Sequence, residues 1–393
     1  MVKIAFDTSA LHPQFKAHAH RGIGRYAREL QSYFATLTDP SVSISNFNFV
    51  ELKSESIDAL LKCVPIGKQT IRQQIVYPLS LAKASAGSDY IHFPAQMDAP
   101  AWGKRKYILT VHDLIPLVCA DLYRSSTQNW KFAFGRWLEL SAIRNASHII
   151  AISQSTSNDL QRILKISPER ISITHLGVDS KFLRITKPIA VEEQAVRAEL
   201  HIPFNRRVVL YVGGIDPRKN YVGLLKTAKE VVSRYKEIAE EPPCFVIAGN
   251  IESDREFPKL LKLRKDLDIE GDVLLIGYVS EKNLHLLYGI SSMLFFPSLY
   301  EGFGLTPLEA LAAGLPVVTS NTSAMPEVVG DAAVLVSPQN YSECAAGIFS
   351  VLDNPSFSND LAARGKARAK LFPWEKTGAE TVKVYQSLES KCQ

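Results

Sequence analysis

The sequence predicts an α/β fold made of two open parallel sheets, each with helices on both faces. Short apolar segments of strand length alternate with helical segments along the chain, which is typical of parallel sheets. The alternation is interrupted once, at residues 181–205, by a polar stretch in which little regular structure is expected. A chain of 393 residues has room for two or three domains.

The elements of the first half are predicted from apolar periodicity. The expected strands are residues 3–7, 42–50, 89–93, 106–112, 147–152 and 171–175. A helix is expected from Ile23, because apolar residues recur there at helical spacing, namely Tyr26, Ala27, Leu30 and Phe34. Further helical segments are expected at residues 55–84 and 126–145, and Ser153 is expected to cap another helix.

The second half repeats this alternation. Its expected strands are residues 208–212, 244–249, 273–277, 293–297 and 315–319, and its helices lie near residues 220–238, 256–267, 281–289 and 341–352. Ligands of open α/β sheets bind beyond the carboxyl ends of the strands. The polar and glycine-rich features of this sequence follow such strand ends, so one cleft between the two halves is expected to hold the site.

The segment that follows the expected strand at 293–297 predicts a phosphate site. Gly302 and Gly304 permit positive φ angles and a close approach of the backbone to a ligand. Thr306 is predicted to cap a helix, with Pro307 at its first position. A glycine loop that leads from a strand into a helix N-terminus offers free N–H groups and the helix dipole to an anion.

Two carboxylates flank this loop. Glu309 follows Thr306 by three residues, so a capping box alone would explain it, and contact with a ligand is the alternative. Glu301 precedes the two glycines and has no helix to cap. This position is unusual in a purely structural loop, and Glu301 is therefore predicted to be functional.

Two cations follow another strand end. Residues 213–220, Gly-Gly-Ile-Asp-Pro-Arg-Lys-Asn, lead from an expected strand into an expected helix. Arg218 could bind a diphosphate through forked hydrogen bonds, and Lys219 could bind it as a point charge. A solvated pair of cations is the alternative, but positive charge near a helix N-terminus is unfavourable without an anion.

Other motifs are less specific. Gly22 and Gly24 match a GxGxxA pattern, which favours a glycine-rich loop near a ligand phosphate over an NAD site. His112 and Asp113 end an expected strand, where a histidine is either catalytic or structural. The Asp-Leu-Asp at 266–268 has metal-binding spacing but lies among leucines in an expected helix, and is interpreted as a solvated face. HExxH, Walker and GxSxG motifs are lacking, which excludes zinc proteases, P-loop NTPases and α/β-hydrolases.

Charge and composition limit which partners and which cellular location are expected. Residues 1–183 contain 21 Lys and Arg against 14 Asp and Glu, whereas the whole chain carries +5. This excess is either an ordinary solvated surface or a contact with an anionic membrane or an acidic substrate. No apolar run could span a bilayer, and the first residues predict a strand and not a signal peptide. A cytoplasmic protein is expected, with peripheral membrane contact left open.

Together these motifs resemble the retaining glycosyltransferases of family 4, also called group 1, over nearly the whole chain. The resemblance rests on Glu301 and Glu309 as an E-x7-E pair, the N-terminal glycines, and residues 111–116, 213–220 and 372–375. It implies a GT-B fold, in which two Rossmann-like domains face each other across a cleft. The expected domains are residues 1–183, residues 184–373, and a C-terminal helix at 374–393 that crosses back to the first domain.

The resemblance implies roles for the matching residues. Glu301 would hold hydroxyls of the donor sugar, and Glu309 would hold the ribose. Lys219 matches the phosphate lysine of the family. His112 matches a histidine that stabilises charge near the primary hydroxyl of the sugar. The remaining donor contacts would come from the N-terminal glycines, the glycine loop and two strand ends, that is Gly22, Gly24, Gly302, Phe303, Gly304, Leu305, Gly249, Tyr278 and Val279.

The sequence departs from the family at one position. The family often has an arginine where Gly214 stands, and Arg218 is the candidate to replace it as the second phosphate cation. On the other side of the reaction, Arg21 and Asp113 are the residues expected near the acceptor.

The resemblance also implies the reaction. In the same-face mechanism the leaving diphosphate takes the acceptor's proton, so no nucleophilic carboxylate is needed, and the sequence offers none. No metal or other cofactor is expected, because protein cations would neutralise the phosphates. The expected donor is GDP-mannose, with a UDP-sugar second, and the expected acceptor is a growing glycan or a lipid-linked saccharide. No nucleic acid is expected as a partner.

Three other classes of protein fit the sequence less well. An epimerase or phosphorylase on the same scaffold is disfavoured by an E-x7-E pair together with a separate acceptor-side glycine loop. A non-catalytic nucleotide-sugar-binding subunit would have lost His112 or the acceptor loop. A dehydrogenase fits least, because the GxGxxA pattern lies well beyond the first expected strand.

Overall fold

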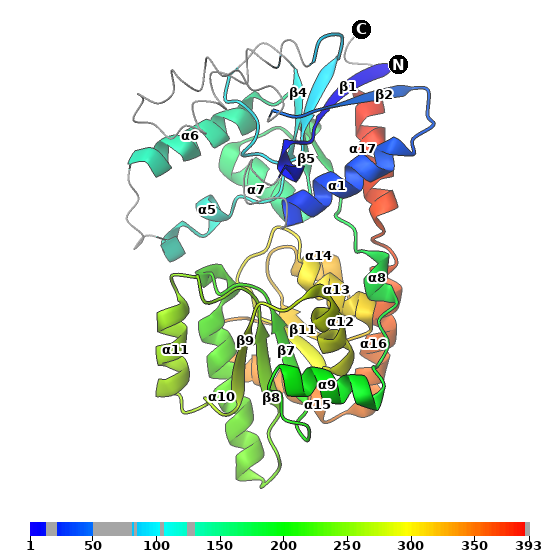
Figure 1. Cartoon of the computed structure of the whole chain (residues 1–393). Helices are drawn as coiled ribbons and strands as arrows, with labels where there is room; N and C mark the ends of the chain where they lie inside the picture. Colours follow the sequence, from blue (N-terminus) through cyan, green and yellow to red (C-terminus); the bar gives the residue numbers. More distant parts are fainter. Residues whose placement is uncertain (13–21, 50–80, 82–84, 103–105, 124–129, 390–393) are drawn as a thin grey trace. The chain divides into compact units, whose positions relative to one another are not determined.

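The computed structural model describes residues 1–12, 22–49, 81, 85–102, 106–123 and 130–389. These residues form two compact units (Figure 1). Unit 1 comprises Met1–Gly177 and Trp374–Gln393, and unit 2 comprises Val178–Pro373. Arg21 lies outside the described residues, and so does all of the expected helical segment at 55–84 except Leu81. Within the described ranges, no helix has the length and hydropathy of a membrane span.

Unit 1 is built on a parallel six-stranded sheet with the strand order β2-β1-β3-β4-β5-β6. Its strands are β1 (Val2–Asp7), β2 (Val42–Phe47), β3 (Tyr90–Phe93), β4 (Tyr107–Val111), β5 (His148–Ala151) and β6 (Ile171–Ile173). Every residue of β3, β4 and β5 is buried, as expected for the central strands of a sheet covered on both faces. The six strands predicted in the first half are confirmed.

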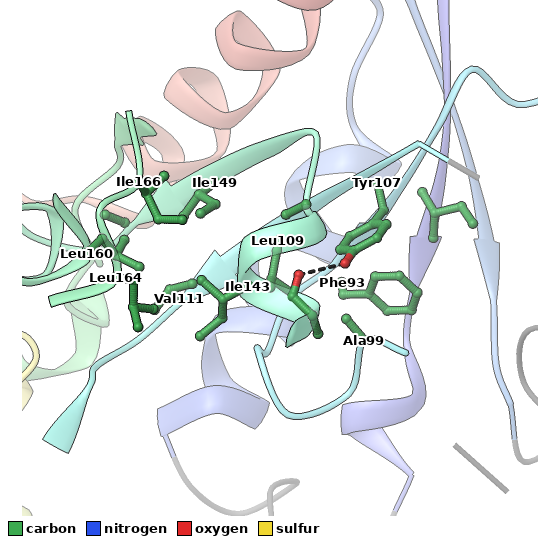
Figure 2. Packing of buried hydrophobic residues seen from close by; sticks show 14 of the residues in the cluster. Phe93, Ala99, Tyr107, Leu109, Val111, Ile143, Ile149, Leu160, Leu164 and Ile166 are labelled. Atoms are coloured by element: carbon green, nitrogen blue, oxygen red, sulfur yellow. Dashed lines mark hydrogen bonds between the residues drawn. The ribbon is translucent and has the colours of Figure 1, made fainter. Parts of the chain in front are cut away.

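One face of this sheet packs against α6 (Trp130–Asn145) and α7 (Gln154–Leu164). Figure 2 shows the buried apolar cluster at this face, which includes Leu109, Val111, Ile143, Ile149 and Leu160. The Ser153 side chain caps α7, as predicted, by accepting a hydrogen bond from the backbone of Thr156. Since side chains alternate along a strand, Thr110 and His112 are directed to the opposite face of the sheet.

That opposite face packs against α1 (Gly22–Ala35) and α17 (Trp374–Glu389). Phe34 of α1 meets Phe6 of β1 edge-to-face, with ring centroids 5.2 Å apart. The two helices approach each other at Gly378, where an added Cβ would lie 2.3 Å from Cγ of Tyr33. Unit 1 also contains η1 (Ser9–Leu11), α5 (Ile115–Val118), η4 (Ala120–Tyr123) and η5 (Pro168–Arg170).

Unit 2 contains a second parallel six-stranded sheet, with the order β12-β11-β10-β7-β8-β9. Its strands are β7 (Val208–Val212), β8 (Cys244–Ala248), β9 (Val273–Gly277), β10 (Met293–Phe296), β11 (Val317–Ser320) and β12 (Val334–Val336). Its helices are α8 (Ser180–Leu183), α9 (Ala190–Glu199), η6 (Pro217–Lys219), α10 (Tyr221–Glu237), α11 (Phe257–Asp266), α12 (Glu281–Ile290), α13 (Leu305–Ala313), α14 (Met325–Val329), α15 (Tyr341–Leu352) and α16 (Pro355–Ala369).

The polar stretch at 181–205 is not structure-poor, contrary to expectation. It contains the end of α8 and all of α9, in which only Val196 and Arg197 are buried, so that α9 gave little periodic signal. Phe182 of α8 packs edge-on against His285 and Tyr288 of α12, with centroids 5.3 and 5.8 Å away. This contact joins α8 to a helix of unit 2. Unit 2 accordingly begins at Val178, and the units divide after Gly177 and not after residue 183.

Gly378→Ala is expected to destabilise unit 1 by about 1–3 kcal/mol, because the new methyl group would overlap the Tyr33 ring. Gly135→Ala is the matched control, since an added Cβ at Gly135 in α6 meets nothing within 4 Å. That change should be neutral, or stabilising by up to about 1 kcal/mol. Urea denaturation followed by circular dichroism measures both variants, and equal stabilities would contradict the close α1–α17 contact.

Candidate active site

The loop between β10 and α13 is ended by Gly304. This residue has φ 113° and is the N-cap of α13, and a Cβ added to it would lie 2.2 Å from Cε of Met325. Only glycine fits both conditions. The prediction that Thr306 caps the helix is therefore wrong, because α13 already begins at Leu305.

Glu309 is correspondingly not part of a capping box, since the N-cap of α13 has no side chain to share in one. It is buried, at 7% exposure, and the Tyr288 hydroxyl donates a hydrogen bond to its Oε2 at 3.4 Å. Helix capping, the purely structural explanation of Glu309, is therefore excluded.

Glu301 is held by two cations from η6. Lys219 Nζ lies 2.6 Å from its Oε1, and Arg218 Nη1 lies 2.8 Å from its Oε2. The Ser298 hydroxyl also donates to Oε1, at 3.0 Å. Arg218 is fixed in turn by donating to the carbonyl oxygen of Tyr300 at 3.1 Å. Two motifs that are far apart in the sequence thus form one ion cluster.

This cluster is largely removed from water. The side chains of Arg218, Lys219 and Glu301 are only 19%, 15% and 11% exposed. Asp216 lies at its edge, 3.7 Å from Arg218 Nε and 40% exposed. The three most buried groups together carry one net positive charge, and the more exposed Asp216 balances it.

The pKa values reflect this environment. Burial alone would raise the pKa of Glu301, but the charges of Lys219 and Arg218 outweigh burial and lower this pKa to about 2. Burial, assisted by the charge of Arg218, lowers the pKa of Lys219 despite the nearby carboxylate. Glu301 is therefore fully ionised at neutral pH.

The segment after β11 supports the same loop, and sequence reasoning missed it. Ser323 Oγ accepts a hydrogen bond from the Glu301 backbone N–H at 3.0 Å. Thr322 Oγ1 donates to the Leu299 carbonyl oxygen, also at 3.0 Å. The available signal was their position, since they follow the carboxyl end of the strand that neighbours β10.

The turns after β7, β8 and β9 contain the other predicted donor residues. Gly249 has φ 152°, and an added Cβ would lie 2.2 Å from the carbonyl oxygen of Gly213, so glycine is needed there for close backbone packing. Gly214 has open space at its Cβ position. Tyr278 is 79% exposed, and Val279 beside it is half-buried. These residues lie at the strand ends, as predicted.

In unit 1, His112 follows β4 and is held from several sides. Its backbone N–H donates to Gln96 Oε1 at 3.0 Å, and Gln96 Nε2 donates to the Asp113 carbonyl oxygen at 3.1 Å. Its ring Nε2 donates to the Pro94 carbonyl oxygen at 2.8 Å. The Tyr26 ring meets the imidazole edge-on, with centroids 5.3 Å apart. None of these partners was predicted.

The N-terminal glycines are not in a loop. Gly22 and Gly24 form the first turn of α1, and Gly24 is buried there, so the expected glycine loop is corrected to a helix start.

Asp113 has a structural role, because its Oδ1 accepts a hydrogen bond from the backbone N–H of Ile115 at 3.1 Å. The Asp-Leu-Asp at 266–268 is a solvated face, as predicted, and Asp266 pairs there with Lys262.

Two family models match this chain. The model described as Glycosyl transferases group 1 matches residues 192–368, and the model described as Glycosyltransferase Family 4 matches residues 20–182. O-antigen chain mannosyltransferase B of Escherichia coli is 28% identical over 93% of this chain and 96% of that protein. Serotype-specific mannosyltransferase WbdA of Escherichia coli is 26% identical over 81% of this chain, which spans 37% of that protein.

Solved structures share the fold. Sucrose-phosphate synthase from Thermosynechococcus elongatus matches with a TM-score of 0.71 and 20% identity, over all of both chains. Anabaena Alr3699/HepE in complex with UDP and glucose matches with a TM-score of 0.70 and 17% identity, over 99% of this chain and 100% of that one.

The two parallel sheets and the likeness to these solved structures define a two-domain α/β GT-B fold. The family matches define the protein as a glycosyltransferase. The chain belongs to the group 1 glycosyltransferases, with the Family 4 model matching its N-terminal half.

Acid is expected to destabilise unit 2 through Glu301. Because its pKa falls from 4.5 to about 2 on folding, its contribution is complete above pH 4.5 and is lost as the pH drops toward 2. The loss is on the order of 2–3 kcal/mol. Glu301→Gln should be less stable than wild type at neutral pH and should flatten this part of the pH profile, measured by urea denaturation.

The control for this experiment is Glu281→Gln. Glu281 also pairs with a lysine, Lys181, but its side chain is 65% exposed, so water screens the pair. This variant should retain most of the acid-dependent loss. A Glu301→Gln variant with the wild-type pH profile would contradict the buried pairing.

Proposed function

We propose that this enzyme transfers a hexose, mannose from GDP-mannose, to a hydroxyl group of a growing glycan or a lipid-linked saccharide. The observation that carries the proposal is the buried ion cluster of Arg218, Lys219 and Glu301 beside the glycine loop. Mannose is favoured because the two relatives named above are mannosyltransferases. A UDP-sugar is the alternative donor, because HepE was solved with UDP and glucose.

The two cations are proposed to bind the donor's diphosphate, together with the backbone N–H groups at the start of α13. A diphosphate would compete with Glu301 for the same Arg218 and Lys219 donors. The carboxylate would then be available to accept hydrogen bonds from hydroxyls of the sugar. Glu309 is proposed to hold the ribose, and the turns at Gly249 and Tyr278 the base.

The proposed chemistry proceeds on one face of the sugar and retains its configuration. The bond from the anomeric carbon to the diphosphate breaks while the acceptor oxygen forms a new bond to that carbon. The acceptor's proton passes to the leaving diphosphate. Lys219 and Arg218 stabilise the charge that develops on this leaving group, and His112 stabilises charge near the sugar. Asp113 and Arg21 are proposed to lie near the acceptor, and no metal or other cofactor is required.

The proposed location is the cytoplasm, with peripheral contact at the inner face of the membrane. The net positive charge of residues 1–183 supports this contact. So does Trp137 of α6, which is 52% exposed and stacks on Phe134 with centroids 5.9 Å apart. Pelleting with anionic vesicles should weaken as salt rises. Equal pelleting with neutral vesicles would contradict an electrostatic contact.

The donor class is tested by incubating the enzyme with a panel of nucleotide sugars, with and without acceptor. Acceptor-dependent release of GDP from GDP-mannose is expected, with an α-linked product by NMR. An epimerised nucleotide sugar would instead identify an epimerase, and release of UDP alone would identify the alternative donor. Transfer should persist in EDTA, and its abolition would contradict a metal-free mechanism.

Lys219→Ala is expected to lower kcat by at least about 100-fold, because one preorganised donor to the leaving diphosphate is lost. Lys226→Ala is the matched control, since Lys226 on α10 is exposed and rests against the Tyr341 ring at 5.1 Å. Its transfer rate should stay at the wild-type value. Circular dichroism should show both variants folded, and normal transfer by folded Lys219→Ala would contradict the assignment.

A further inference from the structure

A chain of buried hydrogen bonds crosses one face of the unit 1 sheet. The Tyr385 hydroxyl of α17 lies 2.6 Å from His92 Nδ1 of β3, and His92 Nε2 lies 2.8 Å from Thr110 Oγ1 of β4. Thr110 Oγ1 lies 3.0 Å from the Tyr26 hydroxyl of α1. All four residues have 0% exposure. Four elements that are distant in the sequence are thus joined by polar side chains.

This chain lies within an apolar environment. The His92 ring lies 5.4 Å from the ring of Phe6, and Tyr385 lies 5.9 Å from Phe34. Apolar side chains of the same shape could fill these positions without the cost of desolvating polar groups. A fully paired polar network fixes its side chains in one arrangement, because hydrogen bonds are directional and apolar contacts are not.

The imidazole of His92 is neutral. Burial, with a smaller effect from the charge of His112, lowers the pKa of His92 to about 3. One ring nitrogen therefore donates and the other accepts, so His92 links Tyr385 and Thr110 without carrying a charge into the core.

At its Tyr26 end, this series of hydrogen bonds is continued by a ring contact with His112. Thr110 precedes it by two residues on the same face of β4, and the Tyr26 ring meets its imidazole at 87° with centroids 5.3 Å apart. The other side of the imidazole is fixed by the Pro94 carbonyl oxygen, 2.8 Å from Nε2. The phenol ring of Tyr26 is therefore fixed at its hydroxyl end and touches His112 through its edge.

We propose that Tyr26 is a positioning residue for His112, and that the hydrogen-bond chain through Thr110, His92 and Tyr385 holds Tyr26 in place. The inference rests on the role proposed above for His112 in stabilising charge near the sugar. Tyr26 does not touch the reacting atoms in this scheme. It restricts the orientation of the imidazole, and helix α17 contributes to the geometry of His112 through Tyr385.

Tyr26→Phe tests this inference, because it removes the hydroxyl and keeps the ring. We expect kcat to fall about tenfold with little change in KM for the donor, because the imidazole is proposed to stabilise charge that develops only in the transition state. Tyr107→Phe is the matched control. Tyr107 is also buried, on the same strand β4, but its hydroxyl donates to the Ala142 carbonyl oxygen at 2.6 Å on the other face (Figure 2). It should lose stability and keep kcat.

Thr110 provides a second pair of variants that does not alter the tyrosine. Thr110→Val removes the shared hydroxyl at constant shape and should lower kcat as Tyr26→Phe does. Thr110→Ser keeps the hydroxyl and should retain most of the wild-type kcat. Equal rates for these two variants would overturn the inference.

A double-mutant cycle with His112→Ala separates this inference from the proposed function. If Tyr26 acts through His112, Tyr26→Phe should cause no further fall in kcat once His112 is alanine. Independent, multiplicative falls would overturn the positioning role alone. A wild-type transfer rate in His112→Ala would instead overturn the proposed role of His112, and the inference with it.

Discussion

The pairing of Glu301 with Lys219 and Arg218 joins the two loops of unit 2 on which the candidate site depends. Charges at this depth are costly unless each has a partner in good geometry. The Glu301 carboxylate is the partner of both cations, 2.6 Å from Lys219 Nζ and 2.8 Å from Arg218 Nη1. Gly304 ends the loop at a positive φ so that α13 can start beside the cluster. The backbone of Glu301 is fixed separately by Ser323. The loop is thus held in shape by contacts other than the ion pairs themselves.

In both units, a candidate site residue is held by residues that follow the neighbouring strand of the same sheet. In unit 2, Glu301 follows β10 and is held by Ser323, which follows the neighbouring strand β11. In unit 1, His112 follows β4 and is held by Pro94 and Gln96, which follow the neighbouring strand β3. Parallel strands end at the same edge of a sheet, so the loop after one strand can support the residue that follows the next.

The sequence was sufficient for features that repeat. The successive apolar residues of a buried strand such as Tyr107–Val111, or apolar positions such as Tyr26 and Phe34 at helical spacing, give concordant signals, and these elements were predicted well. Single polar residues give no such signal, so Ser323 and Gln96 could not be found before the strands were placed side by side. The cap at Thr306 was misassigned because Gly304 begins the helix earlier through its backbone conformation. α9 was missed because only two of its residues, Val196 and Arg197, are buried, which leaves no periodic apolar pattern.

We propose that Arg218 takes the place of the arginine that the family often has where Gly214 stands. An arginine at this position would supply a second cation, yet the Cβ position of Gly214 faces open space. The second cation of the cluster comes instead from Arg218, one residue before Lys219 in η6. A short 3₁₀ turn has about three residues per turn, so adjacent side chains diverge. Here they converge on the two oxygens of one carboxylate because Arg218 is also tied to Tyr300. The site therefore has two cations without an arginine at 214.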